Sequence, residues 1–267
     1  MRRGDSLYVL FGLLIVGVLL GVVFWQASYN SSIRIDRVAP HGVALIDELS
    51  LTDTDPGFID ELNETVHKAG YWLDYYPPSD VVIPLFWALP ALGYDMVIIR
   101  AHSTGWWPGD KITIFTGERY DAGKYQWEQL NHLVFRASNS LQGGPLYFTV
   151  SPEYIWKESR GTFPGSLIVM MGCTGLINNQ MASAFTTKGA KAYVGWYGPV
   201  TVQQTDSATL SLVQTLSQNH TELTKAVSYA SNLAGQPMWY RSDNGFEYQG
   251  GLGLYPASAG TLTFRDI

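Results

Sequence analysis

Two short apolar stretches decide the predicted fold: Asp95–Ala101, which reads DMVIIRA, and Ser166–Met171, which reads SLIVMM. Their apolar residues are consecutive, which is typical of strands covered on both faces in a parallel sheet. His102 follows the first stretch directly, and Gly172 and Cys173 follow the second. Because ligands bind beyond the carboxyl ends of parallel strands, we expect these side chains to project at one sheet edge.

Outward from these stretches, short apolar runs alternate with segments of helical pattern, which predicts βαβ units and a mostly parallel sheet. Asp55 can cap a helix that Pro56 begins and Gly70 ends. The predicted strands are Gly42–Leu49, Trp72–Tyr76, Asp95–Ala101, Ser166–Met171 and Ala192–Gly195, with short extra strands at Ile112–Thr116 and, at an edge, Leu146–Val150. The predicted helices are Pro56–Ala69, Val81–Leu89 (interrupted by Pro84), Tyr125–Ser138, Asn179–Lys188, Asp206–Gln218 and Thr221–Ala234.

The N-terminal run Leu7–Trp25 reads LYVLFGLLIVGVLLGVVFW, without charge or proline. Nineteen helical residues span about 28 Å, close to the thickness of a bilayer core. We therefore expect residues 1–6 to be a cytoplasmic tip, 7–26 a transmembrane anchor, 27–41 a linker, and 42–267 an α/β domain with a C-terminal β-hairpin.

The flanking charges bear on how this anchor is oriented. Arg2 and Arg3 favour a cytoplasmic N-terminus and a domain outside the cell membrane, although Arg34 and Arg37 oppose that bias. A cleaved signal peptide is the alternative, but its apolar region is normally only about 7–15 residues long. Both interpretations export the domain.

Composition limits the function classes. The net charge is −6 and no Lys/Arg run occurs, so nucleic acid is not an expected partner. Neither a dinucleotide fingerprint nor a P-loop is present, and the five histidines are scattered. We therefore expect neither a metal nor a cofactor.

The chain has one cysteine, Cys173, so an internal disulfide is impossible. One interpretation is an inert buried thiol. The other is a nucleophile that His102 activates and whose leaving group it protonates. Ser103, Thr104 and Gly105 would then form a turn that presents backbone N–H groups to an oxyanion. Gly172 and Gly175 flank the cysteine and would let the substrate backbone approach.

An apolar block ending in histidine, followed by one ending in small-Cys, resembles the caspase-like (clan CD) cysteine peptidases, especially CHAT and gingipain-type domains. The similarity extends to Cys173-Thr174-Gly175-Leu176, to Gly189–Trp196, and to Asp206 with its helix Ser207–Leu216. It covers roughly Gly42–Ala234. The resemblance implies an α/β fold of three layers, a caspase-like sandwich with a mostly parallel central sheet, here preceded by one transmembrane helix.

The resemblance also implies residue roles. Cys173 would be the nucleophile and His102 the general acid/base. The backbone N–H groups of Cys173 and Ser103 would form the oxyanion hole. The family normally has glycine where this chain has Ser103, and a serine forced to positive φ would be strained.

Substrate-binding residues are less marked. The family commonly selects the residue before the cleaved bond by charge, so Asp47, Glu48 or Asp206 would receive a basic side chain. Asp206 also suits a helix cap. Trp106, with Trp107, follows the histidine turn and would wall a substrate groove or pack on the domain.

These features together predict a membrane-anchored, extracytoplasmic cysteine endopeptidase that acts on peptide or protein substrates and contacts lipid through residues 7–26. The alternative is a catalytically inactive caspase-like domain that binds a peptide or partner protein. Thiol enzymes with a nucleophile elbow fit poorly, because Met171 stands where they have glycine and only His220 follows Cys173.

Overall fold

A central six-stranded sheet has the order β11-β8-β7-β3-β1-β2 in the computed structural model. All neighbouring pairs are parallel except β11 with β8. The strands are β1 (Gly42–Asp47), β2 (Trp72–Tyr76), β3 (Met96–Arg100), β7 (Leu167–Met170), β8 (Ala192–Trp196) and β11 (Leu252–Tyr255). The prediction of an α/β fold with a mostly parallel sheet is confirmed.

The structure describes residues 41–105, 110–139, 143–219, 221–235, 239–241 and 247–267. They belong to a unit that spans Arg37–Ile267. The predicted tip, anchor and most of the predicted linker lie outside the described residues. Within the described ranges, no helix has both the length and the apolar character needed to span a bilayer.

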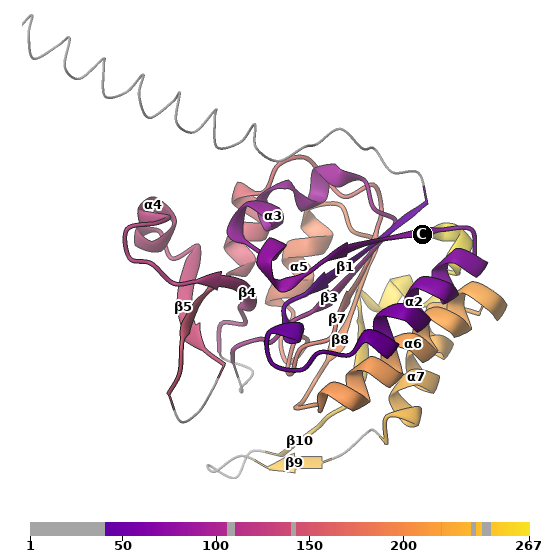
Figure 1. Cartoon of the computed structure of the whole chain (residues 1–267). Helices are drawn as coiled ribbons and strands as arrows, with labels where there is room; N and C mark the ends of the chain where they lie inside the picture. The colour runs from indigo at the N-terminus through magenta and orange to yellow at the C-terminus, as the bar shows by residue number, and fades with distance from the viewer. Residues whose placement is uncertain (1–40, 106–109, 140–142, 220, 236–238, 242–246) are drawn as a thin grey trace, which may run out of the picture. The chain divides into compact units, whose positions relative to one another are not determined.

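Helices cover both faces of the central sheet (Figure 1). One face carries α2 (Pro56–Lys68), α6 (Val202–Asn219) and α7 (Leu223–Leu233), and the other carries α3 (Ile83–Ala88) and α5 (Gln180–Thr187). Strand β1 shows why its apolar residues are consecutive. Val43 and Leu45 enter the core under α2 and α6, whereas Ala44 and Ile46 enter the opposite core, and all four are fully buried.

Local signals account for the bounds of α2. The Asp55 carboxylate accepts a hydrogen bond of 3.0 Å from the N–H of Phe58, and Pro56 occupies the first turn. Gly70 follows the end of the helix at φ 87°. In contrast, α6 begins at Val202, four residues before Asp206. Asp206 therefore does not cap that helix.

A second sheet, of three strands, has the order β4-β6-β5. It consists of β4 (Ile114–Arg119), β5 (Val134–Ser138) and β6 (Leu146–Val150). The predicted helix over Tyr125–Ser138 is wrong, because helix α4 covers only Gln126–Leu130. The chain then turns at His132, with φ 56°, and continues as β5, which pairs antiparallel with β6. Strand β6 is thus the central strand of its sheet and not the predicted edge.

The C-terminal region splits between two pairings. Strands β9 (Trp239–Arg241) and β10 (Glu247–Gln249) pair antiparallel with each other. Strand β11 instead extends the central sheet beside β8. Short single-turn elements complete the fold at Leu49–Leu51, Pro78–Asp80, Leu89–Leu92, Tyr154–Glu158, Ala257–Thr261 and Phe264–Asp266.

Candidate active site

His102 and Cys173 occupy equivalent places beyond two neighbouring strands. Strands β3 and β7 are parallel, and Ile99 is the register partner of Met170. His102 comes three positions after Ile99, and Cys173 comes three positions after Met170. The prediction that they follow adjacent parallel strands is confirmed.

The two strand ends approach so closely that Gly172 has no room for a side chain. A Cβ at this position would lie 2.4 Å from the carbonyl oxygen of Ala101 and 3.1 Å from the Ser103 hydroxyl. The missing side chain therefore admits the backbone that follows β3. The prediction that Gly172 makes room for a substrate backbone is wrong, since that space is already filled.

Two hydroxyl groups tie the histidine turn to the cysteine turn. The Ser103 hydroxyl donates to the carbonyl oxygen of Cys173. The Thr174 hydroxyl donates to the carbonyl oxygen of Gly105 at 2.5 Å. Thr174 has φ 56°, an uncommon value for a β-branched residue, so the turn after the cysteine is strained. Sequence patterns alone did not single out Thr174.

The Cys173 thiol is half-buried and faces the segment after β8. Its Sγ lies 3.3 Å from the carbonyl oxygen of Val200 and 3.4 Å from the Val200 nitrogen, as donor and acceptor respectively. Burial raises the pKa of the thiol, and the N–H groups of Val200 and of Cys173 itself oppose that rise. Cys173 is therefore a neutral thiol near pH 7.

The His102 imidazole is also half-buried. Its ring packs edge-on against Phe115 of β4, with centroids 5.9 Å apart. Burial lowers the pKa of His102, and the Asp53 carboxylate opposes that change. The imidazole is thus neutral at pH 7 and able to accept a proton. Among the described residues, no hydrogen bond joins this ring to the Cys173 thiol.

Among the described residues, the backbone N–H groups of Ser103 and Cys173 have no acceptor in another residue. Ser103 faces Ile114 across an antiparallel bridge whose hydrogen bonds come from Thr104 and Phe115. Its own N–H consequently points away from β4. Ser103 is not among the described non-glycine residues with positive φ, so its side chain brings no such strain.

Arg100 lies inside β3, fully buried, between two carboxylates. Its Nη1 lies 2.8 Å from Asp47, and its Nε and Nη2 each lie 2.9 Å from Asp206. Although burial lowers the pKa of the guanidinium, these hydrogen bonds outweigh it and hold the pKa above its ordinary value. Asp47 and Asp206 thus neutralise Arg100 in this structure, and their binding of a basic substrate side chain stays a prediction. The arginine in the apolar stretch DMVIIRA was the available signal for this cluster.

Glu48 directly follows β1 and is also fully buried. Its Oε2 accepts a hydrogen bond of 2.8 Å from the backbone N–H of His102. Its Oε1 has no hydrogen-bond partner among the described residues.

Trp106, the predicted wall of a substrate groove, lies outside the described residues. The edge at the carboxyl ends of the strands thus carries a thiol, an imidazole and two N–H donors, with the buried Glu48 carboxyl group beneath them.

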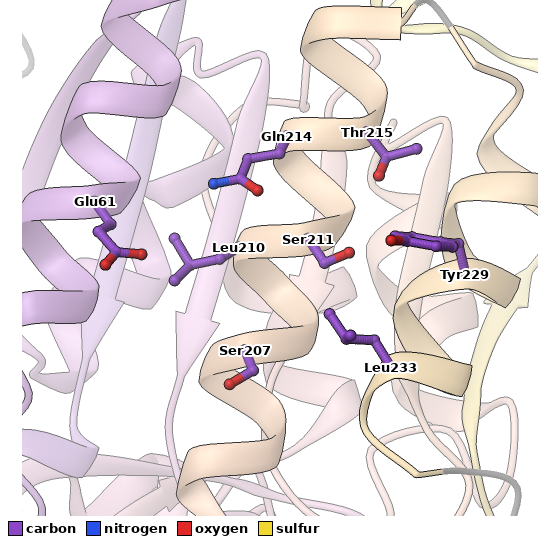
Figure 2. Close-up of a pocket in the computed structure, with 8 residues that line it drawn as sticks. All are labelled: Glu61, Ser207, Leu210, Ser211, Gln214, Thr215, Tyr229 and Leu233. Carbon is purple, nitrogen blue, oxygen red and sulfur yellow. The ribbon is translucent and has the colours of Figure 1, made fainter.

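A surface cavity of about 560 Å³ lies elsewhere, over the helices α2, α6 and α7 (Figure 2). Leu210 and Gln214 of α6 point toward Glu61 of α2, whereas Ser211 and Thr215 of α6 point toward α7. None of its lining residues is a predicted site residue. Within the described ranges, no group of three or more His, Cys, Asp or Glu residues is arranged to hold a metal ion.

No protein-family model matches the chain, and a search of curated proteins finds no match either.

Proposed function

We propose that the protein is a caspase-like cysteine endopeptidase in which Cys173 is the nucleophile and His102 the general acid/base. The observation that carries this proposal is the equivalent placement of the two residues beyond the parallel neighbours β3 and β7. The backbone N–H groups of Ser103 and Cys173, neither of which donates to the backbone of another described residue, stand at the same edge.

The proposed reaction begins with the neutral imidazole removing the thiol proton. The sulfur then forms a bond to the peptide carbonyl carbon, and the N–H groups of Ser103 and Cys173 stabilise the oxyanion. As the C–N bond breaks, the imidazolium of His102 protonates the leaving amine. Water, deprotonated by His102, hydrolyses the thioester and restores the thiol.

In the proposed reaction, the Cys173 thiol must first break its two contacts with the Val200 backbone. Its contacts of 3.3 and 3.4 Å with the Val200 backbone compete with the contact to the imidazole that the reaction needs. The proposed reaction therefore requires the sulfur to rotate about the Cα–Cβ bond of Cys173, away from Val200. Substrate binding at the segment after β8 would favour this rotation by displacing Val200.

The thiol's contact with Val200 also favours a second candidate, a non-catalytic domain with the same architecture. In that case Cys173 is a structural link between the turn after β7 and the segment after β8, and the domain binds a peptide or partner protein without cleaving it. The two candidates differ in one property, which is whether the reactivity of the thiol depends on His102.

A peptide acyloxymethyl ketone tests this dependence, because it alkylates an activated thiolate after its peptide has bound beside the thiol. We expect labelling of the wild-type chain, none of Cys173→Ala, and at least about 100-fold slower labelling of His102→Ala, in line with general base catalysis. His132→Ala is the matched control, since that exposed histidine follows α4 and should not alter the rate. Equal labelling of His102→Ala and wild type would favour the non-catalytic domain.

We further propose that residues 7–26 anchor the chain in the cell membrane with the domain outside. The chain enters the domain at Gly42, the amino end of β1, whereas the site lies beyond the carboxyl ends of the strands. The six residues of β1 place the amino and carboxyl ends of this strand about 20 Å apart. Resistance of the chain to alkaline carbonate extraction, with loss of the domain to external protease on intact cells, tests this placement.

A further inference from the structure

Glu48 takes no part in the proposed bond-breaking steps, although it lies directly under the site. Its side chain is 0% exposed. One carboxyl oxygen accepts the His102 N–H at 2.8 Å, and the other has no hydrogen-bond partner among the described residues. A carboxyl group in such a place is costly to bury, so its retention calls for a physical reason.

The contacts of Glu48 hold the end of β3 at two points. Its backbone N–H donates to the carbonyl oxygen of Arg100 at 2.8 Å, and its side chain accepts the N–H of His102, two residues later. Glu48 therefore holds the backbone where β3 passes into the histidine turn. The next residue in that turn is Ser103, whose N–H has no acceptor in another described residue and is one of the two proposed oxyanion donors.

The charged groups that face Glu48 come from β1, the strand that it follows, and from the neighbouring strand β3. Asp47 of β1 repels a negative charge on it, and Arg100 of β3 attracts one. The hydrogen bonds of Arg100 to carboxylates go instead to Asp47 and Asp206, at 2.8 and 2.9 Å. Glu48 is thus left with the His102 N–H as its direct partner.

We propose that Glu48 is a positioning residue, which fixes the backbone at His102 and thereby the places of the imidazole and of the Ser103 N–H relative to Cys173. This inference rests on the proposed function and deepens it. Glu48 touches neither substrate nor reacting atoms. It acts through the main chain of the general acid/base.

This role makes the site sensitive to pH through Glu48. Burial raises the pKa of Glu48 to about 7; the His102 N–H lowers it, Asp47 raises it and Arg100 lowers it. An ionised carboxylate accepts a stronger hydrogen bond than a neutral carboxyl group. The backbone at His102 is consequently held more firmly above pH 7 than below it.

Amide hydrogen exchange in the full chain measures this hold directly. At pH 8 we expect Glu48→Leu to lower the protection of the His102 amide about tenfold, the loss that follows from one hydrogen bond to a charged group. Glu48→Gln keeps an acceptor for the His102 amide. In this variant the protection of that amide should match the wild-type value at pH 6, but it should not increase toward pH 8 as it does in wild type. Glu61→Gln, an exposed substitution on α2, is the control and should change nothing.

Labelling by the peptide electrophile supplies the second readout. The rate of the alkylation step should fall in Glu48→Leu and be rescued in Glu48→Gln, while the affinity of the reversible complex is unchanged. Unaltered protection of His102 in Glu48→Leu, or wild-type pH dependence in Glu48→Gln, overturns the inference. Lost protection with an unaltered alkylation rate overturns the positioning role alone. Labelling that persists in His102→Ala overturns the proposed function, and the positioning role with it.

Discussion

Replacing Arg100 by methionine removes the guanidinium that both Asp47 and Asp206 contact within the core. Arg100 and Asp47 have side chains that are 0% exposed, and Asp206 has a side chain that is 6% exposed. Methionine fills a similar volume, so the change leaves two buried carboxylates without their cation. Loss of one partner from a buried ion pair costs about 3–5 kcal/mol in free energy of unfolding. Because the free energy of unfolding of a domain is only about 5–15 kcal/mol, we expect Arg100→Met to lose a large part of its stability at pH 7.

The loss should depend on pH in a definite direction. Burial raises the pKa of Asp206 and Arg100 lowers it, so removing Arg100 raises it further in the folded protein. A carboxyl group whose pKa is higher folded than unfolded binds more protons in the folded state, and stability then falls as pH rises. The destabilisation by Arg100→Met should therefore be smaller at pH 4.5 than at pH 7.

Urea unfolding of wild type and Arg100→Met at the two pH values measures this difference. Adding Asp206→Asn to Arg100→Met should recover part of the stability at pH 7, because it removes one unpaired charge. Arg119→Met is the control, since this exposed arginine stacks on Tyr147 and should lose only about 0.5–1 kcal/mol. A loss below 1 kcal/mol for Arg100→Met, or an equal loss at both pH values, would refute the reasoning.

Three further predictions follow from local geometry. Asp55→Ala should lower the free energy of unfolding by about 1 kcal/mol through loss of the α2 cap, whereas Asp60→Ala on the same helix should be near neutral; equal urea midpoints for the two would contradict the capping role. Gly172→Ala places a Cβ 2.4 Å from the Ala101 oxygen, so we expect a loss of about 1–3 kcal/mol in urea unfolding together with slower electrophile labelling, and an unchanged midpoint would count against the close approach. Burial raises the pKa of Cys173 above the ordinary cysteine value of about 8.5, so the rate of its alkylation by iodoacetamide should still rise with pH beyond that value. A rate that levels off below about pH 8 would show that the thiol is activated in the resting state.

The amino-acid sequence by itself determined the elements of the central sheet and the residues at its carboxyl edge. Consecutive apolar residues specify strands buried on both faces, and Asp55, Pro56 and Gly70 specify the bounds of α2, because these signals act within a few residues of the chain. The equivalent placement of His102 and Cys173 followed from the same local patterns once their strands were taken as neighbours.

The helical pattern over Tyr125–Ser138 was misleading because pairing with β6 outweighs local spacing. Val134 and Phe135 suit a strand, and only the presence of β6 beside them supplies the hydrogen bonds that make one. The second sheet therefore depended on contacts between segments distant in the chain.

Only the tertiary structure decided the partners of the charged and polar side chains at the site. Asp47 and Asp206 contact Arg100, Glu48 contacts the His102 backbone, and the thiol of Cys173 contacts Val200. These partners are 27 to 106 residues apart in the sequence. Burial makes each such pairing strongly favourable over an unpaired group, but which groups are buried together depends on the order of the strands, which no local pattern contains.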